Sequence, residues 1–81
     1  KDKTMNDTLV ASNLNWIGEL KPECSAKIRS TQTPVEVQVE KDGENIIVHF
    51  KYMQKSIAKG QSVVLYDNDI VLGGGIITEI R

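Results

Sequence analysis

The chain has 81 residues and a net charge of −1, with 40% of its residues hydrophobic and 26% charged. This balance is typical of one small folded domain, and it excludes both a disordered tail and a strongly basic nucleic-acid module. No apolar run approaches the ~20 residues needed to cross a bilayer and no signal peptide is evident, so no membrane partner is expected. The single cysteine, Cys24, cannot form an internal disulfide, which favours a reduced, cytoplasmic setting.

The first seven residues are polar around a single methionine, and they predict a leader or linker end over residues 1–7 before a domain over residues 8–81. Beyond them, apolar and polar residues alternate with a period of two, the pattern of half-buried strands. Short strands are expected, in chain order, at residues 8–11, 24–29, 35–40, 46–50, 61–66, 69–72 and 76–80.

Turn signals separate these strands. The Asp42-Gly43 pair predicts a tight hairpin, because glycine adopts the positive φ that hairpin turns require, and Asp67-Asn68 predicts a second turn. No long window carries the 3.6-residue period of a helix, and residues 52–59 could form a single helical turn at most. The sequence therefore predicts an all-β fold, a small closed antiparallel barrel of about six strands, since closure removes the exposed edges that an open sandwich would keep.

Strand alternation also assigns the two faces of the sheet. Lys27 and Arg29 share the outer face of one strand, and Glu36, Gln38 and Glu40 share the outer face of its neighbour. The residues expected to face the core are Ala26, Ile28, Val35, Val37, Val39, Ile46, Val48, Phe50, Val63, Leu65, Ile70, Leu72 and Ile76.

Candidate catalytic groups are few. The only histidine, His49, falls on the strand face opposite Val48 and Phe50, with no nucleophile or orienting group patterned around it. Cys24 has no neighbouring cysteine and too few partners for a zinc site, and its position predicts a small buried side chain. The glycines 73–75 precede strand-forming isoleucines rather than a helix, so they predict a bulge or close backbone crossing instead of a phosphate-binding loop.

The paired cations Lys27 and Arg29 allow two interpretations. Because both point outward from one strand, they could contact a phosphate backbone. They could instead pair across strands with Glu36 and Glu40, which would contribute only a few tenths of a kcal/mol each. From charge alone, we expect the ion pairs.

Four stretches occur in an order and at a spacing that resemble one known family. They are Asn15-Trp16-Ile17, Ala26-Lys27-Ile28-Arg29, Gly60-Gln61-Ser62 with Tyr66-Asp67, and Leu72-Gly73-Gly74-Gly75-Ile76-Ile77. This series resembles the C-terminal barrel of the tRNA-specific 2-thiouridylases of bacteria and organelles. The chain departs from the family's common pattern at Thr31, Lys59 and Val71, where arginine, proline and cysteine are usual, and the first change removes one basic contact.

The resemblance implies a barrel similar to the second domain of translation elongation factors, a fold that often serves as an RNA-facing or interdomain platform. It also implies a parent enzyme with an upstream PP-loop catalytic domain that uses ATP with magnesium to adenylate the wobble uridine of tRNA. A sulfur-donor protein would supply the sulfur that replaces the activated oxygen. The nucleotide loop and catalytic cysteines belong to those upstream domains, so the resemblance implies no catalytic residue, metal or cofactor in this chain.

On this basis the chain is expected to be a non-catalytic barrel that assists tRNA binding and packs against the catalytic domain. The candidate RNA contacts are Lys27, Arg29, Gln32, Lys55 and Lys59. Two other functions stay open from the sequence: a free-standing protein-interaction adaptor with no RNA role, and a small enzyme in its own right. The second is disfavoured because no base, nucleophile or metal set converges.

Overall fold

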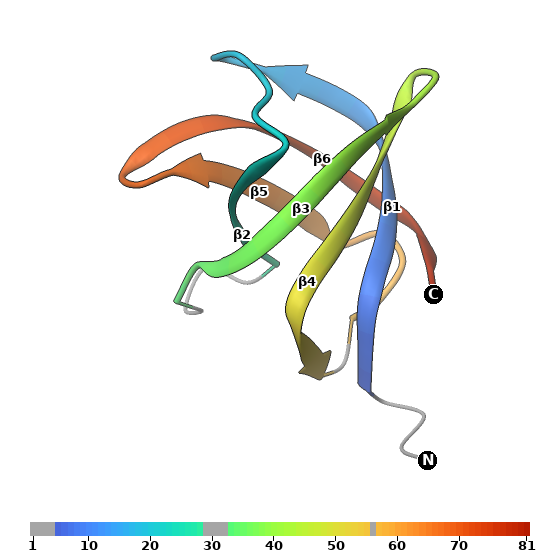
Figure 1. Cartoon of the computed structure of the whole chain (residues 1–81). Helices are drawn as coiled ribbons and strands as arrows, with labels where there is room; N and C mark the ends of the chain where they lie inside the picture. The colour runs from blue at the N-terminus through green and yellow to red at the C-terminus, as the bar shows by residue number, and fades with distance from the viewer. Residues whose placement is uncertain (1–4, 29–32, 56) are drawn as a thin grey trace.

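A computed structural model describes residues 5–28, 33–55 and 57–81, and it shows six antiparallel strands closed into a barrel (Figure 1). The strands are β1 (Met5–Trp16), β2 (Glu23–Lys27), β3 (Val35–Asp42), β4 (Asn45–Lys55), β5 (Ser62–Asp67) and β6 (Ile70–Ile80). Their order around the barrel is β1-β4-β3-β2-β5-β6, with β6 pairing back onto β1. The predicted all-β closed barrel is confirmed. The described part of the chain has no helix long and apolar enough to span a membrane.

The hairpin between β3 and β4 follows the sequence pattern closely. Asp42 pairs with Asn45, and Gly43 takes a φ of 64° in the turn between them. Exposed and buried residues alternate in β3 over 36–40, and half-buried and buried residues alternate in β4 up to Phe50. The β5–β6 turn lies at residues 68–69, where Asn68 adopts a φ of 57°, a conformation that asparagine tolerates better than most residues.

One continuous core fills the barrel interior, because every strand contributes its inward face to the same space. Its buried members are Leu9, Ala11, Ala26, Ile28, Val37, Val39, Ile46, Val48, Phe50, Ile57, Val63, Leu65, Leu72 and Ile77. Val35 is half-buried and packs against this cluster. Two predicted core positions are wrong: Ile70 is exposed at the β5–β6 turn, and Ile77 rather than Ile76 is buried.

A bulge in β6 explains the change from Ile76 to Ile77. Leu65 of β5 pairs with Gly73 while the next residue, Tyr66, pairs with Val71, which leaves Leu72 as an extra residue. One extra residue exchanges the inward and outward faces of everything that follows it. Leu72 still reaches the core, and Ile77 takes the inward position that simple alternation gives to Ile76.

The three glycines of β6 lie where neighbouring strands approach too closely for side chains. A Cβ on Gly73 would lie 2.5 Å from the carbonyl oxygen of Asn15, and one on Gly75 would lie 2.6 Å from that of Ser12. The ladders of β1 and β5 flank this segment on both sides, so it belongs to the sheet. This agrees with the close crossing predicted from the sequence, and it joins the two strands expected at 69–72 and 76–80 into one.

Strand β1 is longer than the expected 8–11. It begins at Met5, within the range assigned to the polar leader, and continues to Trp16. Asn13 has a φ of 54°, and β1 shifts register against β6 between Ser12 and Asn15. The polar residues at this bend break the apolar alternation, which is why the sequence pattern misses the second half of the strand.

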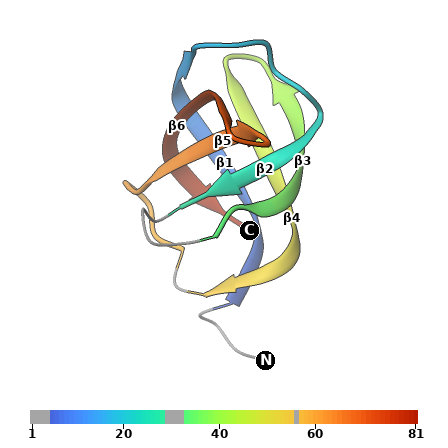
Figure 2. The ribbon, with the colours of Figure 1, turned by 90° about the vertical axis from the view of Figure 1, so that its left-hand side faces the viewer.

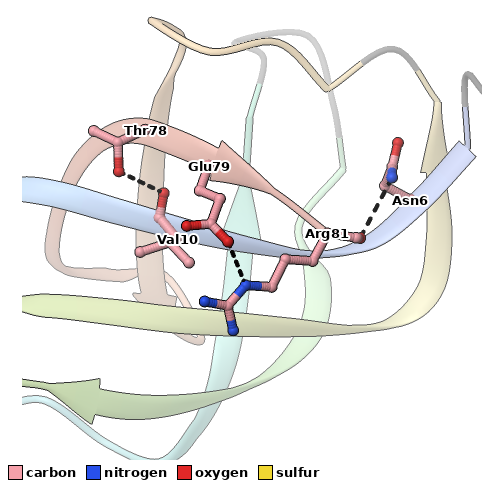
Figure 3. Close-up of polar contacts among 5 residues, drawn as sticks. All are labelled: Asn6, Val10, Thr78, Glu79 and Arg81. Carbon is pink, nitrogen blue, oxygen red and sulfur yellow. Dashed lines mark hydrogen bonds and ion pairs between the residues drawn. The ribbon is translucent and has the colours of Figure 1, made fainter.

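The β1–β6 seam closes the barrel through backbone and side-chain contacts (Figure 3). The Thr78 hydroxyl donates to the Val10 carbonyl at 3.4 Å, beside a shift in register between the two strands. The Arg81 amide donates to the Thr8 carbonyl at 2.9 Å, and the Asn6 side-chain amide donates to the Arg81 carbonyl at 3.3 Å. These bonds fix the first half of β1 beside the end of β6.

Candidate nucleic-acid interface

Lys27 is the last residue of β2, and its side chain is half-buried on the outer face. Its ammonium lies 5.7 Å from the ring centroid of Tyr66 on β5, within cation–π range. The expected pairing with Glu36 and Glu40 is not found among the described contacts of Lys27. Lys51 Nζ pairs instead with Glu36 at 3.2 Å, and His49 Nε2 lies 3.5 Å from Glu40 Oε2.

Two of the candidate RNA contacts, Arg29 and Gln32, lie outside the described residues. Their part in an interface stays a prediction.

Lys55 and Lys59 flank the short connection between β4 and β5. Lys55 ends β4 and pairs with Met5 of β1, while Lys59 is exposed in the loop that leads to β5. The end of β4 and the N-terminal end of β1 lie at the bottom of Figures 1 and 2. The β1–β2 connection and the β3–β4 hairpin lie at the opposite end.

The loop that carries Lys59 is held on both sides. Ile57 is buried in the core, and the Gly60 amide donates to the Ile77 carbonyl at 2.9 Å. The Gln61 side chain accepts from the Ala58 amide at 3.0 Å, and the Gln61 carbonyl accepts from the Ile77 amide at 2.8 Å. The lysine is therefore presented from a short segment anchored to both the core and β6.

Sequence reasoning missed Lys51 and Tyr52. Both are exposed near the end of β4, and the Lys51 ammonium lies 5.7 Å from the Tyr52 ring centroid. The hydrogen bond and charge of Glu36 raise the pKa of Lys51 above its ordinary value. For Lys51 a signal was available: residues 45–66 contain no aspartate or glutamate, and they include Lys51, Lys55 and Lys59. Residues 52–55 belong to strand β4 and form no helical turn.

The outer face of β4, β3, β2 and β5 has a different character. A groove of about 600 Å³ lies on it, and the register places Gln38 opposite both Glu23 and His49 on its floor. Glu23, Glu36 and Asp67 also line this groove. Carboxylates repel phosphate, so this face is unsuited to an RNA backbone.

Several of the groove's charges are already paired. Lys21 forms an ion pair with Asp67, and this hydrogen bond and charge raise the pKa of Lys21. His49 Nε2 is buried and makes no hydrogen bond within the described part of the structure. Carboxylates thus predominate around the groove, where Lys51 also lines the wall and pairs with Glu36, and Lys55 lies outside the lining at the end of β4.

Cys24 and His49 both border the groove, yet they do not form a nucleophile–base pair. Cys24 pairs with Val37, which faces the core, whereas His49 pairs with the outward Gln38. Burial, with a smaller contribution from the negative charge of Asp67, raises the pKa of the Cys24 thiol. A raised pKa keeps the thiol protonated and unreactive. Among the described residues, no three histidine, cysteine or acidic side chains come together as a metal site.

A family model described as the aminomethyltransferase beta-barrel domain matches residues 6–77. The chain belongs to this family. The matched range contains all of β2 to β5 and most of β1 and β6. Membership agrees with the closed all-β barrel and with the resemblance seen in the sequence.

Curated relatives extend the comparison. The chain is 48% identical over 77 residues to the tRNA-specific 2-thiouridylase MnmA of Francisella philomiragia, covering 88% of this chain and 21% of the relative. It is 42% identical over 80 residues to MnmA of Caldicellulosiruptor saccharolyticus, covering 93% and 22%. The match to MnmA of Oceanobacillus iheyensis is 42% over 84 residues, covering 98% and 23%. The chain therefore spans between a fifth and a quarter of the length of these relatives.

Proposed function

We propose that this chain is the C-terminal barrel of a tRNA-specific 2-thiouridylase and that it helps to hold tRNA without taking part in the chemistry. The observation that carries this proposal is the 48% identity to a protein of that name over 88% of the chain. The family resemblance extends the proposal to a cytoplasmic parent enzyme. In that enzyme an upstream PP-loop domain binds ATP with magnesium and acts on the wobble uridine, and a sulfur-donor protein supplies the sulfur.

The barrel's own contribution is electrostatic and positional. Lys55 is exposed at the end of β4, and Lys59 is exposed in the loop that follows. Lysines on a fixed scaffold contact phosphates and fix the register of a folded RNA without reading its sequence. A near-neutral domain supplies only a few such contacts, so its own affinity for tRNA is weak and falls steeply with salt.

Lys27 has a secondary place in this proposal. Its ammonium is close to Tyr66, and the cation–π contact leaves part of the half-buried side chain accessible. Lys27 precedes the segment 29–32 that contains Arg29 and Gln32, so the three side chains form a second candidate contact on the sequence evidence.

The test is a charge-matched pair of double variants in the full-length protein. Lys55→Ala with Lys59→Ala should weaken tRNA binding by roughly 1–3 kcal/mol and leave ATP affinity unchanged. The slope of log affinity against log salt should become shallower by about one unit per lost phosphate contact. The control, Lys21→Ala with Lys41→Ala, removes the same charge from the other end of the molecule. If the two double variants weaken tRNA binding equally, Lys55 and Lys59 do not form a specific contact with tRNA. If neither double variant changes tRNA binding, the chain is better explained as a protein-interaction adaptor.

A further inference from the structure

Strand β4 carries an irregularity that the barrel core does not require. Asn6 of β1 pairs with Gln54, and Thr8 pairs with His49, so residues 50–53 of β4 lie opposite Asp7 alone. The β3–β4 register ends at the pair of Val37 with Phe50. Residues 51–53 therefore have no register partner in β1 or β3, and the pairing with β1 resumes at Gln54. We call residues 51–53 the β4 bulge.

The bulge turns large side chains outward. Strict alternation from the buried Phe50 would place Tyr52 in the core, but Tyr52 is 63% exposed and Met53 is 45% exposed. A bulge that redirects a side chain is a recurrent feature next to functional sites. Exposing an aromatic ring and a methionine side by side forgoes the burial that normally stabilises such residues.

The buried side chain of Gln54 is hydrogen-bonded to the backbone of the β4 bulge. Gln54 is only 7% exposed, and its side-chain amide donates to the carbonyl of Tyr52 at 3.0 Å and to that of Met53 at 3.4 Å. Buried polar groups are retained in small domains when they are hydrogen-bonded. The position of Tyr52 is thus fixed by contacts within the strand.

One lysine lies beside the Tyr52 ring, and two more follow in the sequence. The Lys51 ammonium lies 5.7 Å from the ring centroid, and Lys55 and Lys59 follow in a stretch without acidic residues over 45–66. Glu36 pairs with Lys51, but both groups are well exposed, and an exposed ion pair contributes little free energy to hold the lysine in place. An exposed aromatic ring with lysines beside it is the combination that binds unpaired nucleotides by stacking and by phosphate contact.

We infer that Tyr52 is a stacking platform for an unpaired base of the bound RNA, with the neighbouring lysines holding the flanking phosphates. The inference rests on the proposed tRNA-binding function, because it identifies the kind of nucleotide that this end of the barrel contacts. The bases of an RNA duplex are stacked on one another and offer no free face. Tyr52 should therefore strengthen binding to an RNA loop and not to a duplex.

The experiment measures binding of the 81-residue chain at low salt to a tRNA anticodon-arm hairpin and to a fully paired duplex with the same number of phosphates. Tyr52→Ala should weaken hairpin binding about five- to a hundredfold and leave duplex binding and the salt slope unchanged. Tyr52→Phe keeps the ring and should bind the hairpin like the wild type. The control is Ile70→Ala, because Ile70 is 65% exposed but lies at the β5–β6 turn, outside the lysine-rich segment.

A second measurement reports the stack itself. Ring protons of Tyr52 should shift upfield in NMR spectra when the hairpin is added and not when the duplex is added. If Tyr52→Ala binds the hairpin as tightly as the wild type while the Lys55 and Lys59 variants do not, the platform is wrong and the tRNA-binding proposal stands. If the wild type binds neither RNA at low salt, the platform is wrong, and the double variants of the full-length protein decide the tRNA-binding proposal separately. If Tyr52→Ala weakens binding to another protein domain and leaves RNA binding unchanged, the platform is also wrong. The β4 bulge would then be a protein-docking surface.

Discussion

Two irregular segments of the barrel, the glycine run of β6 and the bulge of β4, break the sheet in opposite ways. In β6, residues 73–75 approach β1 and β5 so closely that side chains would collide with backbone atoms. In β4, residues 51–53 leave their neighbours and place three side chains in solvent. The first irregularity lets the barrel close. The second contributes nothing to the core, and its basic and aromatic side chains make it the better candidate for a function.

The largest effect is expected at the β6 glycines. Gly73→Ala would add a Cβ 2.5 Å from the Asn15 carbonyl oxygen and would hold alanine at a φ of 152°. Backbone strain and overpacking each cost roughly 1–3 kcal/mol, so the free energy of unfolding should fall by about 2–6 kcal/mol. Chemical denaturation measures this loss.

The matched control for that substitution is Gly43→Ala. Gly43 also has a positive φ, of 64°, but a Cβ there would have no heavy atom within 4 Å. Only the conformational cost of about 1 kcal/mol should remain. Equal losses at Gly43 and Gly73 would mean that close strand approach does not constrain β6.

A smaller effect is expected where β4 leaves the sheet. Gln54→Leu keeps the side chain's bulk and removes the amide that bonds the Tyr52 and Met53 carbonyls. The free energy of unfolding should fall by about 1 kcal/mol, because water reaches the exposed bulge and satisfies part of the lost bonding. Amide hydrogen exchange should accelerate at residues 52–54 and stay unchanged in β3. Unchanged exchange at those residues would show that Gln54 does not hold the bulge.

The same contrast explains how far the sequence predicts the structure. Residues 35–50 alternate strictly around a glycine turn, so their strands, hairpin and inward residues were all predictable. The extra residue at Leu72 and the bend at Asn13 arise from closing the barrel, and no local pattern announces them. For that reason the sequence pattern wrongly assigned Ile70 and Ile76 to the core and did not predict the second half of β1.

The candidate interface was predictable only in part. Lys55 and Lys59 stood out as a charged pair before a strand, and both are exposed in the structure. Tyr52 could not be recognised, because two-residue periodicity from Phe50 assigns it to the interior and only the bulge turns it outward. The expected partners of Lys27 were wrong because register decides which carboxylate each cation meets, and Glu36 lies beside Lys51.

The most direct test of the central claim is amide chemical-shift mapping of the 81-residue chain on addition of tRNA at low salt. The account predicts that the largest shifts fall in residues 51–55 and 57–59, that they fade as salt is added, and that groove residues 23–25 and 66–68 change little. Shifts concentrated in groove residues 23–25 and 66–68, or no shifts in residues 51–55 and 57–59, would contradict the proposed tRNA contact.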